Sequence, residues 1–338
     1  MVVGLGRIGW DFHIPSIADN DGFELVAVVD PLEDRAVEAG EKFKCRHFPN
    51  LDEALEKMKP DLTVIASPTK FHAEQTIASF KHGSDVFCDK PMAISYEEAL
   101  SMATAMKEYG RKFMIYQPRR LSPDFIILKE ILKEGLLGPL FMIKRATSNY
   151  ERRNDWQAFR RNGGGMLNNY GAHYIDQAMN IADSEAEKIS CSLRVAASMG
   201  DADDVVKAII ETKNGILIDI DINQAAAIAL PEWYVFGKNG SMKWENNAWH
   251  VRYYDPAAVK DVGLQDGFAA SNRKYGNGET IPWQEKTIDA TGMKPVDYYD
   301  KCYEYYASGH APFVDISETM EIMRILKVCR ENAGKCTT

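Results

Sequence analysis

The sequence predicts an α/β protein whose first part is a doubly wound parallel sheet and whose second part is an α+β domain. From residue 1 to about residue 118, short apolar runs alternate with amphipathic stretches, which is typical of successive β-α-β units. A glycine-rich turn follows the first run. Beyond residue 119, several strands follow one another with turn signals between them, which favours antiparallel pairing. We therefore expect two domains, residues 1–118 and 119–338.

Length and composition agree with this prediction. The 338 residues exceed the roughly 250 to 300 at which a single core usually stops growing, and 45% of them are hydrophobic. The net charge of -9 argues against nucleic acid as the main partner, because phosphate binding needs a basic surface. No apolar run reaches the ~18 to 20 residues that span a bilayer, and no signal-peptide pattern opens the chain. We expect no membrane segment and a cytoplasmic location.

The six cysteines are scattered along the chain, without a CxxC pair and without a histidine at metal-ligand spacing. This pattern predicts neither a zinc site nor a disulfide framework, and it favours reduced thiols in a cytoplasm. We expect no bound metal.

In the first domain, each expected strand is a short apolar run. These runs are Met1–Leu5, Phe23–Val29, Leu62–Ala66, Asp85–Cys88 and Phe113–Tyr116. The expected helices lie between the runs, where apolar residues recur at helical spacing. They include Glu53–Lys57, His72–Lys81 and Glu97–Lys107. This order predicts a doubly wound topology.

In the second domain, helices and strands are mixed. We expect helices near Asp124–Glu134, Met166–Ala182, Val296–Ala307 and Ile316–Glu331. We expect strands near Leu140–Thr147, Val205–Glu211, Gly215–Asn223 and Glu232–Gly237. Lys213-Asn214-Gly215 and Lys238-Asn239-Gly240 are turn signals between strands. Asp255–Lys294 is rich in Gly, Asn, Asp and Pro, so we expect a long excursion there.

The turn after the first strand matches the pattern Gly-x-Gly-x-x-Gly at Gly4, Gly6 and Gly9, with Arg7 and Ile8 inside it. At a strand-to-helix junction, such a turn lets backbone amides and a helix N-terminus approach a pyrophosphate. The second strand is followed by Asp30, about 20 residues after the turn, the spacing at which a carboxylate meets the adenosine ribose. The two features together predict a dinucleotide-binding Rossmann domain.

Asp30 also bears on the choice of cofactor. A carboxylate about 4 Å from a 2′-phosphate would be repelled by roughly 4 kcal/mol per charge pair at an effective dielectric constant near 20. We therefore expect NAD in preference to NADP, although Arg35 is a nearby cation. The alternative is that Asp30 only caps a helix or lies in a solvated turn.

Further motifs follow the glycine turn in a fixed order. They are Ile65–His72, Val86–Pro91, Tyr116–Arg120, Asp155-Trp156 and the block Gly163–Asp176. Together they resemble the motifs of the Gfo/Idh/MocA family of oxidoreductases, named for glucose-fructose oxidoreductase and inositol dehydrogenase. The resemblance covers nearly the whole chain. It implies a Rossmann domain followed by an open, mainly antiparallel sheet whose bare face often pairs with another subunit. A homodimer or homotetramer is the expected assembly.

The same resemblance implies a reaction and a cofactor site. Family members mostly move a hydride between the nicotinamide and a hydroxyl or carbonyl carbon of a sugar, cyclitol or related polyol. Besides the glycine turn and Asp30, the positions expected to contact the cofactor are Ser67, Pro68, Thr69, His72, Asp89, Lys90 and Gln117. For His72, the alternative is capping or packing of the next helix.

Lys90 and His173 are the catalytic candidates. Alcohol oxidation needs a group that accepts the hydroxyl proton and a group that stabilises charge on the oxygen. Lys90 follows a parallel strand at the edge where ligands bind, and it matches the family's catalytic lysine, in a Glu-Lys-Pro that here reads Asp89-Lys90-Pro91. His173 matches the family's catalytic histidine, and an imidazole exchanges protons near neutral pH. The alternative for Lys90 is an ordinary surface lysine.

Asn169, Trp156, Arg119 and Asp176 are the expected substrate contacts. Asn169 lies four residues before His173, so the two would share one helical face. In dehydrogenases of the family, this position is often aspartate. An amide can only hydrogen-bond, so proton transfer would fall on His173 or Lys90. A core or lid role is the alternative for Trp156, and a solvated helix face is the alternative for Asp176.

Arginines are concentrated in the second domain of this acidic protein, and they could bind a carboxylate or phosphate on the substrate. They are Arg119, Arg120, Arg152, Arg153, Arg160 and Arg161. The alternative is that these side chains are solvated.

These observations predict reversible, NAD-linked oxidation of a secondary hydroxyl on a carbohydrate or cyclitol. Two alternatives stay open. One is a glycosidase that uses bound NAD transiently, oxidising and re-reducing the sugar so that a leaving group is eliminated. The other is a non-catalytic NAD-binding regulator, for which Asn169 is the sequence signal and against which Lys90 and His173 count.

Overall fold

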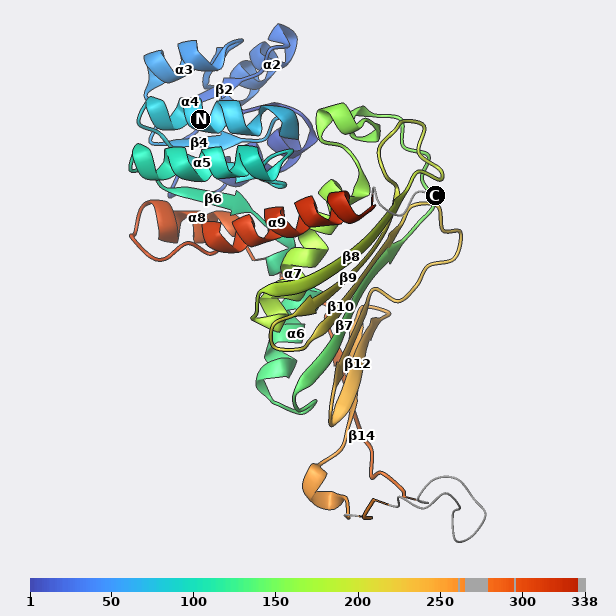
Figure 1. Cartoon of the computed structure of the whole chain (residues 1–338). Coiled ribbons are helices and arrows are strands. Elements are labelled where there is room, and N and C mark those ends of the chain that lie inside the picture. Colours follow the sequence, from blue (N-terminus) through green and yellow to red (C-terminus); the bar gives the residue numbers. More distant parts are fainter. Residues whose placement is uncertain (261, 265–278, 295, 334–338) are drawn as a thin grey trace.

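The computed structural model describes residues 1–260, 262–264, 279–294 and 296–333. Within these residues the chain forms two sheets, the first from N-terminal strands and the second from later ones. Figure 1 shows the first sheet and its helices at one end of the molecule and the long second sheet at the other. The predicted fold class, a parallel α/β sheet followed by an α+β domain with a mainly antiparallel sheet, is confirmed.

The first sheet has six strands in the order β3-β2-β1-β4-β5-β6, which is the order of a Rossmann domain. All its pairings are parallel. The strands are β1 (Val2–Val3), β2 (Ala27–Val29), β3 (Arg46–Phe48), β4 (Leu62–Ile65), β5 (Asp85–Asp89) and β6 (Phe113–Tyr116). Their carboxyl ends therefore meet at one edge of the sheet.

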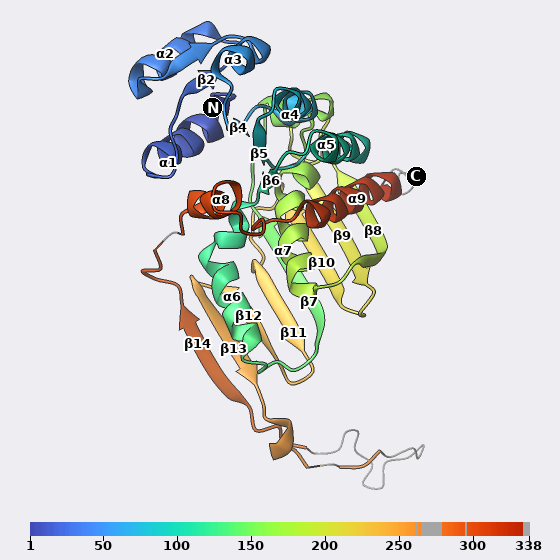
Figure 2. The same ribbon diagram turned by 90° about the vertical axis from the view of Figure 1, so that its left-hand side faces the viewer.

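Helices cover both faces of this sheet, which explains why its strands are apolar runs without alternation. They are α1 (Ile14–Ala18), α2 (Glu33–Phe43), α3 (Leu51–Met58), α4 (His72–Lys81), α5 (Tyr96–Glu108) and, from the C-terminal part, α8 (Tyr298–Tyr306). Side chains of α3, α4 and α5 join one apolar core, and those of α1, α2 and α8 join a second one. Figure 2 shows α4 and α5 on one side of β4 to β6 and α1 and α8 on the other.

Among the described residues, the second sheet has eight strands in the order β14-β13-β12-β11-β7-β10-β9-β8, of which only β7 and β10 pair in parallel. They are β7 (Leu140–Ser148), β8 (Ala186–Arg194), β9 (Val205–Thr212), β10 (Leu217–Asn223), β11 (Trp233–Gly237), β12 (Gly240–Glu245), β13 (Ala248–Tyr253) and β14 (Gln284–Asp289). The helices α6 (Pro123–Lys133), α7 (Ala172–Ala182) and α9 (Ile316–Ala333) pack on it. In Figure 1 they lie on one face, and no helix of the described residues covers the other.

Strand β14 lies inside the expected excursion Asp255–Lys294, as does the short 3-10 helix η7 (Pro256–Ala258). Residues 261 and 265–278 of that excursion lie outside the described residues. The strand was not predicted because its side chains are exposed or only partly buried, so it has no apolar run. No helix among the described residues is both long and apolar enough to cross a bilayer.

Short 3-10 and π-helical segments connect the main elements near the site. They are η1 (Gly9–His13), η2 (Thr69–Phe71), η3 (Pro118–Leu121), η4 (Trp156–Ala158), η5 (Arg160–Asn162) and η6 (Leu167–Gly171). The predicted helix Met166–Ala182 is present as η6 followed by α7. Both η1 and η6 are π-helical, a geometry that is often found at functional sites.

Candidate active site

The candidate site lies at the edge of the first sheet where the parallel strands end. Gly4 follows β1, Asp30 follows β2, and Lys90 follows β5. Ligands of open parallel sheets bind at this edge, beside the point where the strand order reverses, which here is between β1 and β4.

The three glycines of the turn have different roles. A Cβ at Gly4, whose φ is +90°, would lie 2.6 Å from the Ser67 nitrogen, and a Cβ at Gly9 would lie 2.0 Å from the Gly4 carbonyl oxygen. These two glycines let the turn close on the neighbouring strand and helix. A Cβ at Gly6 would meet no described protein atom within 4 Å. The turn is therefore open on the Gly6 side, which fits the approach of a dinucleotide diphosphate.

Asp30 is buried and fixes the glycine turn to the end of β2. Its Oδ2 accepts a hydrogen bond from the Leu5 nitrogen at 2.8 Å, and its Oδ1 accepts one from the Leu32 nitrogen at 2.9 Å. Each carboxylate oxygen has a second lone pair, which is available to a ribose hydroxyl. Of the predicted residues within the turn, Arg7 is exposed and Ile8 packs against the apolar core below.

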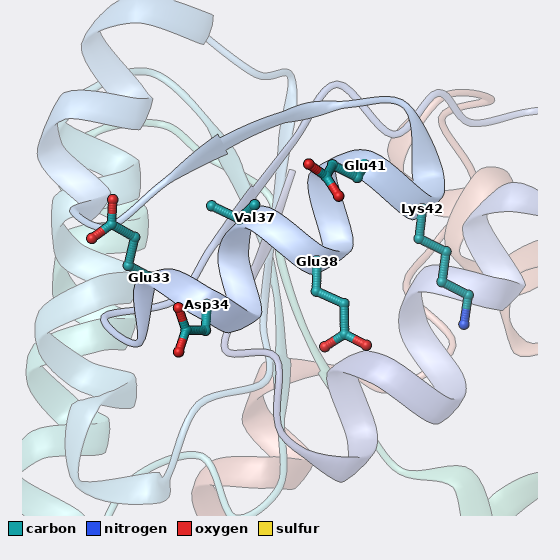
Figure 3. Close-up of a pocket in the computed structure, with 6 residues that line it drawn as sticks. All are labelled: Glu33, Asp34, Val37, Glu38, Glu41 and Lys42. Carbon is teal, nitrogen blue, oxygen red and sulfur yellow. The ribbon is translucent and has the colours of Figure 1, made fainter.

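The surface hollow in Figure 3 lies on α2 and is strongly acidic. It is lined by Glu33, Asp34, Val37, Glu38, Glu41 and Lys42. Four carboxylates beside one ammonium repel a diphosphate, so this hollow does not fit the cofactor's phosphates. Its carboxylates in the first turn of α2 add negative charge near Asp30, which disfavours a 2′-phosphate there.

His72 is buried between the loops that follow β4 and β5. Its Nε2 lies 2.8 Å from the Ser67 carbonyl oxygen, and its Nδ1 lies 3.0 Å from the Pro91 carbonyl oxygen. Burial lowers the pKa of His72. The side chain therefore holds two loops in place, which matches the packing alternative more closely than direct cofactor contact. Pro68 and Thr69 lie in the first of these loops, with Thr69 buried.

Lys90 is partly buried, and its ammonium is bonded to one residue. The Nζ donates to the Asn169 carbonyl oxygen and to Asn169 Oδ1, both at 2.8 Å. Burial lowers the pKa of Lys90 to about 7, Asp89 opposes this shift, and Arg119 is the first of three arginines that add to it. A lysine in this state exchanges a proton near neutral pH, as a catalytic acid or base must.

His173, in the first turn of α7, is buried beside Gln117. Its Nδ1 lies 3.0 Å from Gln117 Oε1. Since an amide oxygen only accepts, Nδ1 carries the proton and Nε2 keeps its lone pair. Burial lowers the pKa of His173 well below its usual value, and the charges of Lys90, Arg119 and Arg145 lower it further. The imidazole is neutral at pH 7, and Nε2 has no hydrogen-bond partner among the described residues.

Asn169 holds Lys90 and belongs to a short chain of polar side chains. Its Nδ2 donates to Gln157 Oε1 at 3.1 Å, and Arg153 Nη1 donates to the same oxygen at 2.6 Å. Both ends of the Asn169 amide therefore have protein partners. Sequence analysis did not find Gln157, because no motif marks a glutamine in this loop. Its neighbour Trp156 has an exposed fraction of 39%.

The structure separates Asp176 from the other expected substrate contacts. Its side chain is 2% exposed, and its two oxygens accept from Arg120 Nη2 at 2.6 Å and Nε at 2.8 Å. The carboxylate is therefore committed to Arg120. Arg119, the neighbouring residue, has its guanidinium over the rings of Tyr170 and Tyr174, at 5.6 and 5.3 Å from their centroids.

Asp89 contacts protein groups from two other parts of the chain. Its Oδ1 lies 2.9 Å from Nε2 of the buried His13, whose Nδ1 lies 2.8 Å from the Tyr299 hydroxyl on α8. Asp89 is thus tied to the first helix and to the C-terminal helices. Sequence analysis did not find Tyr299, since it lies 286 residues from His13 and outside every motif.

The described residues contain no group of three His, Cys, Asp or Glu side chains that could hold a metal ion.

Both parts of the chain match models of one protein family. Residues 1–117 match its NAD-binding Rossmann domain, described as "Oxidoreductase family, NAD-binding Rossmann fold". Residues 125–243 match the GFO/IDH/MocA C-terminal domain.

Curated relatives and solved structures agree with this match. The scyllo-inositol 2-dehydrogenase (NADP(+)) of Bacillus subtilis is 24% identical over 100% of this chain and 94% of its own length. The 2,7-anhydro-N-acetylneuraminate hydratase of Escherichia coli is 25% identical over 72% of this chain and 66% of its own length. The WlbA dehydrogenase of Bordetella pertussis, solved with NADH and UDP-GlcNAcA, has a TM-score of 0.79 at 20% identity, with 99% of this chain and 96% of that chain covered.

The chain spans 50 to 66% of the length of the curated relatives that it matches first. The two family matches nevertheless lie on the two sheets in the order that the structure shows. The chain therefore belongs to the Gfo/Idh/MocA family of oxidoreductases and begins with the NAD-binding Rossmann domain of that family.

Proposed function

We propose that the protein is an NAD-linked oxidoreductase acting on a secondary hydroxyl or carbonyl carbon of a sugar, cyclitol or related polyol. The observation that carries this proposal is a lysine with a pKa near 7 beside a neutral histidine whose Nε2 is free of protein partners among the described residues. Relatives named scyllo-inositol 2-dehydrogenase (NADP(+)) and D-glucoside 3-dehydrogenase support the substrate class.

Each residue of the site has its own proposed role in the reaction. NAD, when bound, supplies the hydride acceptor. Neutral Lys90 takes the hydroxyl proton at Nζ during oxidation, and protonated Lys90 returns it in the reverse direction. His173 accepts at Nε2 a hydrogen bond from a neighbouring hydroxyl of the polyol and so orients the substrate. Asn169 holds Nζ in place through two hydrogen bonds, so its role is to position Lys90.

A hydride assay over a panel of polyols and sugars tests the proposal. Replacing Lys90 with Met or His173 with Ala is expected to lower turnover by about 10² to 10⁴, the usual contribution of a positioned acid or base. The matched control is Lys81→Met, at an exposed lysine on α4 for which no ion pair is found among the described residues. NAD affinity, measured by calorimetry, separates a chemical defect from a binding defect. Unchanged turnover in both site variants would refute the assignment.

A second candidate function is transient oxidation without net redox change, as in an NAD-dependent glycosidase. The observation that favours it is a relative whose name describes a hydratase, an enzyme name without a redox term. The test is whether substrate is consumed while NADH does not accumulate and the cofactor stays bound through purification. Stoichiometric NADH release would exclude this candidate for the substrate in question.

We also propose NAD as the preferred cofactor and a homodimer or homotetramer as the assembly. The first rests on Asp30 and the acidic turn of α2, where Glu33 and Asp34 stand. The second rests on the face of the second sheet that no described helix covers. Comparing the dissociation constants of NAD and NADP, and measuring the mass in solution, tests the two statements separately.

A further inference from the structure

Arg119 is a cation at the site without an anionic protein partner. Among the described residues, no carboxylate lies within ion-pair distance of its guanidinium, which makes no hydrogen bond to the protein there. Its neighbour Arg120 is different, because it pairs with Asp176 at 2.6 Å and with Glu318 at 2.9 Å. The contrast shows that the fold neutralises one of two adjacent arginines and leaves the other available.

The guanidinium of Arg119 is nevertheless held in place. It lies over the rings of Tyr170 and Tyr174, and the main chain is fixed because the Arg119 carbonyl oxygen accepts from Gln177 Nε2 and from Ser122 Oγ, each at 2.8 Å. On the same ring of Tyr174, the buried Arg145 guanidinium lies 4.0 Å from the centroid. A guanidinium positioned over aromatic rings is oriented for planar recognition of an oxyanion.

The charge around the catalytic candidates is predominantly positive. Arg119 lowers the pKa of both Lys90 and His173, and Arg7 and Arg153 also act on Lys90. Asp89 is the one carboxylate among the groups acting most strongly on Lys90, and its Oδ1 is already bonded to His13. Arg153 is paired with Glu151 at 3.1 Å and with Asp155 at 3.0 Å, whereas a neutral polyol would leave Arg119 without compensation.

We propose that the substrate carries an anionic group, a carboxylate or a phosphoryl group, which binds the Arg119 guanidinium while the reacting hydroxyl faces Lys90 and His173. The inference rests on the proposed function and narrows its substrate class to anionic sugars or related polyols. The diphosphate of the cofactor is not the expected partner of Arg119. That group belongs at the turn after β1, and β6, which precedes Arg119, lies three strands away in the sheet, or roughly 14 Å at the usual strand spacing.

The test is calorimetry on the full chain loaded with NADH, so that alcohols bind without reacting. The probes are D-glucose, D-galactose and N-acetyl-D-glucosamine, each compared with its uronic acid and its 6-phosphate, which separates carboxylate from phosphoryl recognition. The variant is Arg119→Gln. The matched control is Arg46→Gln, because that guanidinium also stacks on a ring, 5.7 Å from Phe48, and has no ion pair among the described residues. Arg46 stands at the amino end of β3, the opposite edge of the sheet from the site.

At least one anionic sugar is expected to bind about 10-fold or more tightly than its neutral parent. Arg119→Gln should remove this preference, a loss of about 10- to 100-fold for a charge-assisted contact, and Arg46→Gln should keep it. The inference is overturned if no anionic probe binds more tightly than its parent, or if Arg119→Gln retains the preference. If an anion binds through Arg119 but no substrate gives or receives a hydride, the proposed function is wrong. If neutral polyols give up a hydride at a rate that Arg119→Gln does not change, only this inference is wrong.

Discussion

At position 169 a side-chain amide accepts one of the two hydrogen bonds of the Lys90 ammonium, where dehydrogenases that this chain resembles often have a carboxylate; the main-chain carbonyl oxygen accepts the other. An amide carries no charge, so it holds Nζ without stabilising the charged form as an ion pair would. The pKa of Lys90 is therefore left near 7 by burial, with Asp89 as the opposing carboxylate. We therefore expect the lysine to exchange a proton near neutral pH.

The pH dependence of oxidation follows from this pKa. Below pH 7, Lys90 is protonated and cannot accept the hydroxyl proton, so kcat/KM for oxidation is expected to rise about tenfold per pH unit and to level off above pH 7. Reduction needs the protonated form and should fall above pH 7. Profiles between about pH 5 and 9 in both directions check this. If kcat/KM for oxidation instead rises and levels off well below pH 6, the proton transfer belongs to His173, whose pKa is lower.

Replacing the amide at position 169 tests its effect on the pKa of Lys90. In Asn169→Asp, a carboxylate next to Nζ favours the ammonium, so the rising limb of the oxidation profile should move up by at least about one pH unit. The matched control is Asn180→Asp, because Asn180 Oδ1 accepts from Lys129 Nζ at 3.1 Å on the surface. That variant should leave the profile unchanged. A profile that stays in place in Asn169→Asp would contradict the proposed role of the amide.

At the scale of elements, one glycine of the turn is expected to matter for stability and another for NAD binding. Gly9→Ala places a Cβ 2.0 Å from the Gly4 carbonyl oxygen, so it is expected to cost about 2 kcal/mol of unfolding free energy or more. In Gly6→Ala the added Cβ meets no described protein atom within 4 Å, so stability should not change, but NAD affinity should fall by about tenfold or more. Denaturant unfolding without NAD and calorimetry with NAD measure the two effects. Equal loss of stability in both variants, or normal NAD affinity in Gly6→Ala, would contradict the division.

The strands that the sequence predicts differ in burial from several of those that it does not predict. Three of the missed strands, β3, β8 and β14, lie at sheet edges, and their side chains are mostly exposed or only partly buried. They have no apolar run because most of their side chains reach solvent, although α9 packs on β8 and α2 and α3 contact β3. The fourth edge strand, β6, was predicted because all of its residues are buried, and α9 packs against it. Helix α2 was also missed, since two of its three buried residues are alanines and the third is a glycine.

The residues of the site also differ in whether the sequence predicts them. Lys90, Asn169, His173 and Gln117 were predicted because each belongs to a local motif. The structure bonds Lys90 to Asn169 and His173 to Gln117, and their joint role stays a prediction. Gln157 and Tyr299 were not, because their positions depend on packing between distant segments. Asp176 was expected at the substrate, but its partner Arg120 lies 56 residues away, and spacing along one helix does not reveal such a pair.

At the scale of the whole molecule, the C-terminal helices return to the first sheet. The Tyr298 hydroxyl accepts from the Gln117 nitrogen at 3.1 Å, and the Tyr306 hydroxyl donates to the Val86 carbonyl oxygen at 2.5 Å. Helix α8 therefore connects the strand ends of the Rossmann domain to the later part of the chain. The division at residue 118 remains a prediction, with the qualification that α8 packs on the domain before it.

The uncovered face of the second sheet predicts self-association. It combines an ionic ladder, in which Lys207 Nζ lies 2.5 Å from Asp219 Oδ1 and 3.0 Å from Asp221 Oδ2, with neighbouring rings of Phe141 and Phe236, whose centroids are 6.2 Å apart. A charged ladder beside an exposed aromatic patch is a surface that a second copy related by twofold symmetry can match. Sedimentation velocity should show at least twice the mass of one chain.

Phe141→Glu tests which surface holds the copies together. Phe141 is 48% exposed, so a carboxylate there costs little in the monomer but is desolvated in the pair, and the dissociation constant should rise by about tenfold or more. Leu100→Glu is the matched control, because Leu100 is 50% exposed on α5, a helix of the first domain, and its replacement should leave the mass unchanged. If Phe141→Glu sediments as the wild type does while Leu100→Glu dissociates, the interface lies on the Rossmann side and the open sheet is solvated.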